Sequence, residues 1–563
     1  MESDELIKAD RGGHAECHVC RNLNCTGPTR PMSNDSVPTT IQAPTPALLS
    51  RNPLAWLTVF GPGAVVASIT LGSGELIFSA RGGALFGYDV LFLFVVISVL
   101  KWGLVFGLSR HIVLSGVHPY ARMMELPGPR GWFPLMLLLI AAVTTPIWGA
   151  FLPGTIGNFT SWVTGTQDRF NGAVDYLWAM PFLVAVVTLS FTGGYGALER
   201  VQMVIVGAMM VCALVTLILY KPDWLELLKG GIIPQTYQYP EWLASVPDES
   251  IRKIAEQNEW VEVSRYVGVI GGSGFDYLAY TSWLREKHWG WAGIGEATST
   301  DLDEIASDPD HPARQWVRAP LVDCTISFAL VIVFSAVFVA SGVITLGPEQ
   351  QVPTGANFLE MQSKFVTGIH PWLEPLYVIA AYLTMFGSSY GVFEIAATIC
   401  REIVRAMNPD LAQRHHQRLK SIAVGWCGIC AFLILVWSFV YTSSMGGDSG
   451  ILIDLMTPAN LFTGVLSCGL LCFILPWMDW RFLPKPLRLS KPLLLLNCVA
   501  GVIFLYLGLK GYWDSEVEGG EFFQKRWFSI GGIVAVMAVS MVIAAIYASR
   551  GGSNQVKREH QEF

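Results

Sequence analysis

Long apolar segments recur along the whole chain, and they constrain its fold more than any other feature. Charged residues make up only 14% of the 563 residues, against about 25% in soluble globular proteins. Most of the segments reach the roughly 20 residues that a helix needs to cross the bilayer core, about 30 Å thick. The twelve segments are 54–86, 89–108, 132–152, 176–192, 201–220, 263–284, 320–345, 372–399, 421–441, 451–476, 491–510 and 527–548. The sequence therefore predicts an all-α, multi-pass membrane protein.

Motifs of common enzymes are missing from the sequence. It contains no GxxxxGKS or GxxxxGKT phosphate loop, no HExxH zinc motif and no GxSxG nucleophile motif. The net charge of −7 also gives no basic footprint of the kind that binds nucleic acid. We therefore expect no enzymatic activity, no catalytic residue and no resident cofactor. The expected partners are membrane lipid and a small solute, not nucleic acid.

Both ends of the chain are polar. Residues 1–52 are rich in Ser, Thr, Pro, Asn and charge, which predicts a disordered tail, and residues 549–563 form a second tail. Three of the 11 cysteines lie in the first tail beside one histidine: His14, Cys17, Cys20 and Cys25. Their spacing is incomplete for a structural zinc site, so free thiols are favoured and soft-metal binding is the alternative. The other eight cysteines lie in or beside apolar segments, which indicates no disulfide framework.

The distribution of Lys and Arg predicts the orientation. Cytoplasmic loops of membrane proteins carry an excess of these residues. With the N-terminus inside, the short inner loops and the C-terminal tail hold Arg110, Arg122, Arg130, Arg401, Arg405, Arg414, Arg418, Lys420, Arg481, Lys485, Arg488, Lys491, Arg550, Lys557 and Arg558. The short outer loops are poor in both residue types. Both termini are therefore predicted to be cytoplasmic, in a protein of the cell membrane.

A Gly-Ser-Gly motif occurs in the first and in the sixth apolar segment. The two copies are Gly72, Ser73, Gly74 and Gly272, Ser273, Gly274. Glycine weakens a helix because it loses the most backbone freedom on ordering. Unwound backbone is tolerated in a membrane only where it lines a cavity or is buried in protein. Two interrupted helices five segments apart indicate an inverted-repeat transporter, whereas close packing of small residues between helices is the alternative.

Carboxylates accompany these motifs inside the apolar segments. Glu75 follows the first motif, Asp276 follows the second, and Glu394 lies in the eighth segment. A carboxylate within a span costs at least ~2.5–3.5 kcal/mol on insertion scales, so it is normally paired, protonated or part of a site. Arg81 and Lys101 are candidate partners of Glu75 or Glu394. Together with Ser hydroxyls and free carbonyls, such acids suit hard cations such as Mg²⁺, Ca²⁺ or Mn²⁺.

Several stretches resemble the Nramp (natural resistance-associated macrophage protein) family of divalent-metal transporters. They are the GPG that opens the first segment, the ARGGALFGY that ends it, the layout of the sixth segment, and FGSSYGVFEIAATICREIVR in the eighth. The likeness covers about residues 55–480. It implies the LeuT-type fold, with inverted repeats of five helices at about 54–220 and 263–476 and discontinuous helices 1 and 6. Two extra helices would follow within 491–548.

The metal-site signatures of that family are altered in this sequence. Family members carry Asp-Pro-Gly-Asn in helix 1, where this chain has Gly72, Ser73, Gly74 and Glu75. They carry Met-Pro-His in helix 6, where this chain has Gly272, Ser273 and Gly274. Loss of the thioether argues against the usual selectivity for Fe²⁺ or Mn²⁺. The third segment holds no acid or histidine to relay a proton, so the sequence does not support proton coupling.

We therefore expect a secondary transporter that moves a cation, a divalent metal ion of hard type, by alternating access. Glu75 and Asp276 are the expected charged ligands, and Glu394 and Arg81 would support them or couple transport. The glycines of both motifs would allow unwound backbone, and Ser73 and Ser273 would add oxygen ligands. One alternative is a transporter of amino acids or other small organic solutes, whose carboxylate would meet the amides at a half-helix end. Another is a membrane sensor that transports nothing.

Overall fold

The computed structural model describes residues 41–193, 195–247, 249–353, 358–368, 370–445, 451–514 and 526–559. Every regular element in these ranges is a helix. Most of the predicted disordered tail, including its histidine and three cysteines, lies outside the described residues. The last part of that tail differs from the prediction, because the short helix α1 (Pro46–Leu49) lies there and buries Leu48. At the other end, α24 (Arg526–Glu559) continues past the predicted boundary at residue 548.

Ten helical runs in the described ranges are long and apolar enough to cross a membrane. The first run, Pro62–Ser115, contains two spans because the chain turns at Gly87, whose φ is +62°. One further span consists of two shorter helices, Glu259–Val269 and Gly274–Glu286. Counted in this way, the runs correspond to the twelve predicted spans, and the chain is a multi-pass membrane protein.

The spans follow in the order that an inverted repeat requires. The first repeat comprises α3 (Pro62–Thr70) with η1 (Leu71–Ser79) and α4 (Ala80–Phe86), then α5 (Val90–Ser115), α7 (Trp132–Thr164), α8 (Val174–Thr192) and α9 (Tyr195–Tyr220). The second comprises α12 (Glu259–Val269) with α13 (Gly274–Glu286), α16 (Arg318–Ser341) with η6 (Gly342–Leu346), α18 (Glu374–Met407), α20 (His416–Met445), and α21 (Ile451–Asn460) with η8 (Leu461–Leu466) and α22 (Ser467–Phe482). Two further helices, α23 (Lys491–Asp514) and α24, end the chain.

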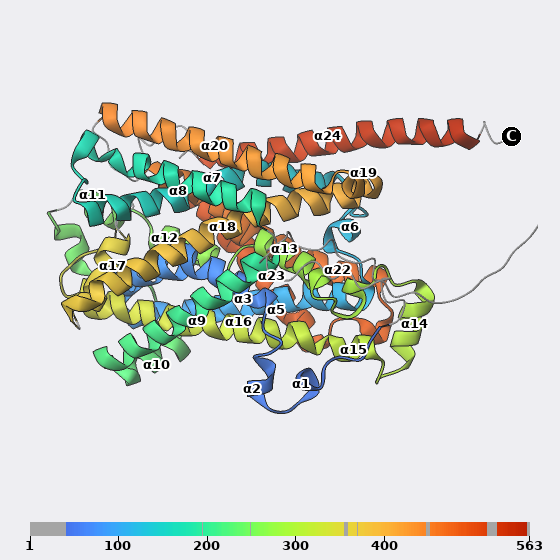
Figure 1. The fold of residues 1–563 in the computed structure, drawn as a ribbon, viewed down its shortest axis with the longest axis horizontal. Helices are drawn as coiled ribbons and strands as arrows, with labels where there is room; N and C mark the ends of the chain where they lie inside the picture. The colour runs from blue at the N-terminus through green and yellow to red at the C-terminus, as the bar shows by residue number, and fades with distance from the viewer. Residues whose placement is uncertain are drawn as a thin grey trace, which may run out of the picture. The chain divides into compact units, whose positions relative to one another are not determined.

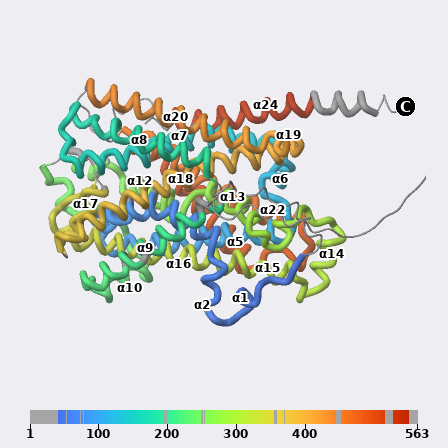
Figure 2. Tube along the Cα trace, in the orientation of Figure 1, coloured from blue at the N-terminus to red at the C-terminus, as the bar shows by residue number. Residues whose placement is uncertain are grey.

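The two repeats interleave in space, as the colours of Figure 2 show. Helix α5 packs against α16, and α3 packs against α18. The short connecting helices separate by side. Those of the predicted outer loops, α10 (Trp224–Ile232), α11 (Glu249–Ala255) and α17 (Phe358–Thr367), lie at one end of the spans, and those of the predicted inner loops, α6 (Pro119–Met123), α14 (Ser299–Ser307), α15 (Pro312–Trp316) and α19 (Pro409–Arg414), lie at the other (Figure 1). Loops predicted to share one side of the membrane therefore do lie together.

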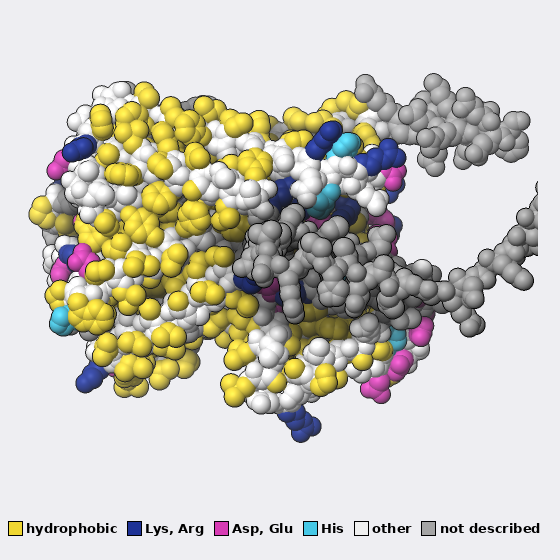
Figure 3. All heavy atoms as spheres, in the orientation of Figure 1, with side chains coloured by type: hydrophobic (Ala, Val, Ile, Leu, Met, Phe, Trp, Pro, Cys, Tyr) yellow, Lys and Arg dark blue, Asp and Glu magenta, His cyan; other side chains and the backbone are white. Residues whose placement is uncertain are grey.

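The outer surface of the spans is apolar. Hydrophobic side chains cover the middle of the visible face, and charged side chains gather toward its two ends (Figure 3). Exposed members include Val204 and Ile218 of α9, Ile429 and Leu433 of α20, and Val542 of α24. A contiguous apolar band of this kind is the surface that lipid covers, because a soluble protein rarely exposes such an area. The apolar side chains of this face are covered by lipid. The candidates for a functional site are therefore the polar groups inside the bundle.

Candidate functional site

The sixth span, which consists of α12 and α13 and is called helix 6 below, is broken in the middle of the bundle. Helix α12 ends at Val269 and α13 begins at Gly274. Between them, Gly271 and Gly272 have φ angles of +76° and +93°. An L-residue in this region is strained, whereas glycine adopts it readily. The second Gly-Ser-Gly motif thus marks a discontinuous helix, as predicted, although Gly271 contributes to the break as much as Gly272 does.

The first span, which consists of α3, η1 and α4 and is called helix 1 below, keeps its helical form through the first Gly-Ser-Gly motif. Residues Leu71–Ser79 form a π-helix that continues α3 into α4, so the expected unwinding at Gly72–Gly74 is not observed. A Cβ on Gly72 would overlap the hydroxyl of Ser388, and a Cβ on Gly74 would lie 2.6 Å from the carbonyl oxygen of Val269. These two glycines therefore serve the close approach of helix 1 to α18 and to the end of α12, which is the packing role of small residues in membranes.

Lys101 of α5 caps the broken end of α12. Its side chain is fully buried, and its Nζ donates to the carbonyl oxygens of Val267 at 2.8 Å, Ile270 at 2.7 Å and Gly272 at 2.6 Å. A lysine ammonium has three donors, and these three short bonds use all of them. The last carbonyls of a helix have no partner within the helix and carry partial negative charge. The Lys101 ammonium gives these carbonyls hydrogen-bond donors and also places a positive charge beside their partial negative charge.

Glu75 lies on the π-helix of helix 1 and points to the same break. Its Oε1 accepts a hydrogen bond of 3.2 Å from the amide of Gly271. Its Oε2 is buried, and no described residue donates to it. The charge of Lys101 interacts electrostatically with Glu75 and with Asp276. One lysine and two carboxyl groups therefore interact within the bundle, where an isolated charge would be costly.

Asp276 belongs to a capping box at the start of α13. Its Oδ2 accepts a hydrogen bond of 2.6 Å from the Ser273 amide, and the Ser273 hydroxyl accepts one of 3.4 Å from the Asp276 amide. This reciprocal pair satisfies two of the free amides at a helix N-terminus. Ser-x-x-Asp is readable in the sequence as a capping box, and it explains why a carboxylate follows the second motif. Unlike Glu75, Asp276 is only partly buried.

The open face of the break lines a small cavity of about 50 Å³. Asp276, Ser273 and Gly272 form one wall of it. The other walls come from both repeats: Ile69, Thr144, Thr145, Trp148, Gly268, Val269, Phe275, Val392, Ile395, Asn460 and Thr463. A water molecule takes about 30 Å³ of liquid volume, so the cavity holds one ion or one to two waters. Pockets for drug-sized ligands are typically about 300–1,000 Å³, far larger than this one.

Two further residues predicted to support the site are paired elsewhere. Arg81 binds Glu262 through Nε at 3.1 Å and Nη2 at 2.6 Å, so it is not the partner of Glu75. Glu394 binds Lys420 Nζ at 2.8 Å, so neither Arg81 nor Lys101 pairs with it. Within the described ranges, no three His, Cys, Asp or Glu side chains are grouped to hold a metal ion. Glu394 is therefore paired with a lysine of α20 and not with Arg81 or Lys101.

The start of helix 1 is held by a residue that the sequence analysis did not select. Asp323 of α16 is fully buried and accepts hydrogen bonds from the amides of Gly61 at 2.9 Å and Gly63 at 2.7 Å. It also accepts one of 2.8 Å from the Tyr280 hydroxyl of α13. The GPG motif thus presents two amides to a carboxylate at a helix N-terminus, a favourable place for negative charge. An acid near the start of the seventh segment was the available signal.

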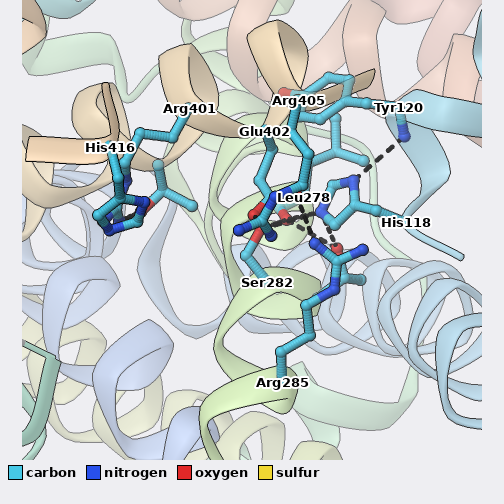
Figure 4. Close-up of polar contacts among 11 residues, drawn as sticks. His118, Tyr120, Leu278, Ser282, Arg285, Arg401, Glu402, Arg405 and His416 are labelled. Atoms are coloured by element: carbon cyan, nitrogen blue, oxygen red, sulfur yellow. Dashed lines mark hydrogen bonds and ion pairs between the residues drawn. The ribbon is translucent and has the colours of Figure 1, made fainter. Parts of the chain in front are cut away.

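A second polar cluster lies at the predicted inner end (Figure 4). Arg285 of α13 and Arg405 of α18 both bind Glu402, at 2.6 Å and 3.0 Å. His118, which precedes α6, packs against α13, where its Nε2 lies 2.9 Å from the hydroxyl of Ser282. Burial lowers the pKa of His118 to about 4, so the imidazole is neutral near pH 7. This cluster joins α13 to α18 beside a cavity of about 510 Å³.

Comparison with known proteins places these features in a family context. A profile described as natural resistance-associated macrophage protein-like matches residues 63–272, which is helix 1 through the break of helix 6. None of the curated protein sequences matches the chain. A manganese transporter of Eremococcus coleocola in complex with an aromatic bis-isothiourea substituted compound has a similar structure, with 15% identity, a TM-score of 0.61, and 92% of this chain and 98% of that chain covered. Two single-residue mutants of the same transporter align over the same shares at 16% identity and a TM-score of 0.63. At this identity, the comparison shows a shared fold.

Proposed function

We propose that this chain, a relative of the Nramp family, is a secondary transporter that moves a divalent metal ion by alternating access. The observation that carries the proposal is the cavity of about 50 Å³ at the break of helix 6, with Asp276 on its wall. Helices of both repeats line it, and substrate sites of inverted-repeat transporters lie at this repeat interface near the bilayer midplane. The expectation that the chain is a transporter and not an enzyme agrees with the family profile and the fold.

The chemistry of the cavity suits a hard cation. The polar groups on its wall are a carboxylate, hydroxyls and one amide, from Asp276, Ser273, Thr144, Thr145, Asn460 and Thr463. No methionine, cysteine or histidine is among the residues that line it. Oxygen donors favour Mg²⁺ or Mn²⁺ over softer metals. We propose Asp276 and Ser273 as ligands of the ion, with Glu75, whose Oε2 has no donor among the described residues, as a second carboxyl group behind the break.

The remaining predicted roles are also part of this proposal. Glu394 and Arg81 form ion pairs with Lys420 and Glu262 and are not among the residues that line the cavity, so we assign them a supporting role in the bundle and not a ligand role. The lysine and arginine bias of the inner loops favours cytoplasmic termini in a cell membrane. The short helices of those loops lie at one end (Figure 1), in agreement with that topology.

An organic substrate is less well supported by the geometry. An amino-acid carboxylate would need the free amides at the start of α13, but the Asp276 carboxylate already accepts from the Ser273 amide. Its other natural partner, Lys101, has its three donors bound to backbone carbonyls. The cavity is also several times smaller than the pockets that hold such ligands. A single desolvated ion is therefore the better fit.

The test is metal binding and uptake by the purified full chain and its Asp276→Asn variant. A ligand that binds only the folded state stabilises it by about 2.7 kcal/mol at a hundredfold excess over Kd. We expect one of Mg²⁺, Mn²⁺, Ca²⁺ or Fe²⁺ to raise the Tm of the wild type and to enter proteoliposomes. Both effects should be lost in Asp276→Asn.

A matched control separates ion binding from helix capping. Asp301 forms the same capping box with Thr298 at the exposed start of α14, accepting from the Thr298 amide at 2.8 Å. Asp301→Asn therefore removes an equivalent cap outside the bundle and should keep the metal response. Loss of the response in both variants, or a Tm shift with amino acids and with none of the metals, would overturn the proposal.

A further inference from the structure

Lys101 fills the place that a bound cation takes in other transporters with broken helices. In such proteins, unwound carbonyls and the C-terminal ends of half-helices coordinate the coupling ion. Here the C-terminal end of α12 faces an ammonium group on the chain itself. Building on the proposed function, we propose that Lys101 is a tethered cation that replaces a monovalent coupling ion at the break. Metal transport by this chain then needs neither Na⁺ nor K⁺.

The geometry leaves no room for a second cation at these carbonyls. The three oxygens of Val267, Ile270 and Gly272 lie 2.6–2.8 Å from Nζ, and the carbonyl of Gly268 lies at 3.5 Å. The stem of the side chain packs against the break, since a Cβ on Gly271 would lie 3.3 Å from Lys101 Cδ. An ion could bind there only after the ammonium had left.

The surrounding charges match a resident ammonium. Glu75 holds the Gly271 amide with Oε1, while its buried Oε2 has no donor among the described residues. The carboxyl groups of Glu75 and Asp276 both interact electrostatically with Lys101. The ammonium thus interacts with the carbonyls of the break and with both carboxyl groups. Lys101 therefore determines ion specificity, because its ammonium occupies the carbonyls behind the cavity and keeps Na⁺ and K⁺ from binding to them.

The test compares monovalent salts in thermal unfolding of the full chain at constant ionic strength. We expect the wild type to have the same Tm in sodium, potassium and choline chloride. Lys101→Met removes the ammonium and keeps an apolar stem, so the freed carbonyls and Glu75 should bind Na⁺ or K⁺. The variant should then melt higher in one of these salts than in choline chloride.

Two further variants keep the outcome decisive. Lys101→Met combined with Glu75→Gln removes the ammonium and the carboxyl group together. The double variant therefore tests the freed carbonyls without a buried carboxyl group that has lost its lysine. Lys420→Met is the matched control, because Lys420 is also buried and binds a carbonyl, that of Gly193 at 2.9 Å, and a carboxylate, that of Glu394. It should lower stability without creating any preference among the salts.

The proposal is overturned by either of two results. One is a wild type that melts higher in sodium or potassium than in choline chloride, or that needs either ion for uptake. The other is that Lys101→Met and its combination with Glu75→Gln fold but show no salt preference. If neither variant can be purified, the wild-type comparison decides alone. Failure of the proposed function would be seen separately, as the absence of any divalent-metal response in a wild type that is insensitive to monovalent salts.

Discussion

Replacing Asp323 by asparagine should release the start of helix 1 while the rest of the bundle stays folded. The carboxylate of Asp323 accepts from three donors: the amides of Gly61 and Gly63 and the hydroxyl of Tyr280. Asparagine keeps one acceptor oxygen and turns the other acceptor into an NH₂ donor. At least one of the two backbone amides then faces a donor and loses its partner inside the protein.

The size of the effect follows from the bonds that are lost. A hydrogen bond to a charged group contributes about 1.5–3 kcal/mol, and an unsatisfied buried donor costs about 1–3 kcal/mol. Loss of the negative charge at the helix N-terminus adds a smaller amount, about 0.3–1 kcal/mol. We expect the local stability of the first turn of helix 1 to fall by about 3 kcal/mol, which is roughly a hundredfold in an equilibrium constant.

Hydrogen exchange measures this local opening directly. The amides of Gly61 and Gly63 lie in a peptide spanning residues 57–70, whose exchange should become about a hundredfold faster in Asp323→Asn. Tyr280→Phe is the matched control, because it removes one of the three donors and leaves both amides paired, so its peptide should change by less than about tenfold. Unchanged exchange in a folded Asp323→Asn protein, or a change no larger than that of Tyr280→Phe, would refute this account of how helix 1 is held.

Two other perturbations test the helix break and the inner cluster. Gly272→Ala places a Cβ 3.1 Å from Asp276 Oδ2 at a φ of +93°, so it should lower Tm more than the control Gly165→Ala. At Gly165, φ is +65° and no atom lies within 4 Å of the added Cβ, so only backbone strain of about 1–2 kcal/mol is expected. Equal losses of Tm in the two variants would contradict crowding at the break. Burial lowers the pKa of His118 to about 4, below the 6.5 of an unfolded chain, so its contribution to stability is complete above pH 6.5 and is lost as pH falls toward 4, by up to about 3 kcal/mol. Unfolding measured from pH 7.5 to 5 should be less pH-dependent in His118→Gln than in the wild type, and identical profiles would show that another group titrates.

The fold was predictable because lipid imposes a simple rule on sequence. A span must be apolar over about 20 residues, so each helix leaves a visible run, and the connecting loops show their side through lysine and arginine. The break of helix 6 was predictable for a similar reason, since Gly272 and Ser273 interrupt such a run beside an acid.

The same motif misled in helix 1. Gly72 and Gly74 weaken a helix by themselves, but they also let it approach Ser388 and Val269 closely. Sequence gives the small residue and not the neighbour that needs it small, so packing and unwinding cannot be told apart there. The same limit applies to buried charges, because the chain shows an intramembrane lysine at position 101 but not the three carbonyls that it meets.

The capping box at the start of α13 affects how long an ion would remain bound at Asp276 under the proposed function. The Asp276 carboxylate accepts from the Ser273 amide, so under the proposed function the ion shares that carboxylate with the protein's own backbone. An ion that displaced this cap would cost the helix end about 0.5–2 kcal/mol. A carboxylate that is shared in this way binds the ion less tightly and favours its rapid release. Rapid release suits the proposed transporter, which must free the ion on the other side of the membrane.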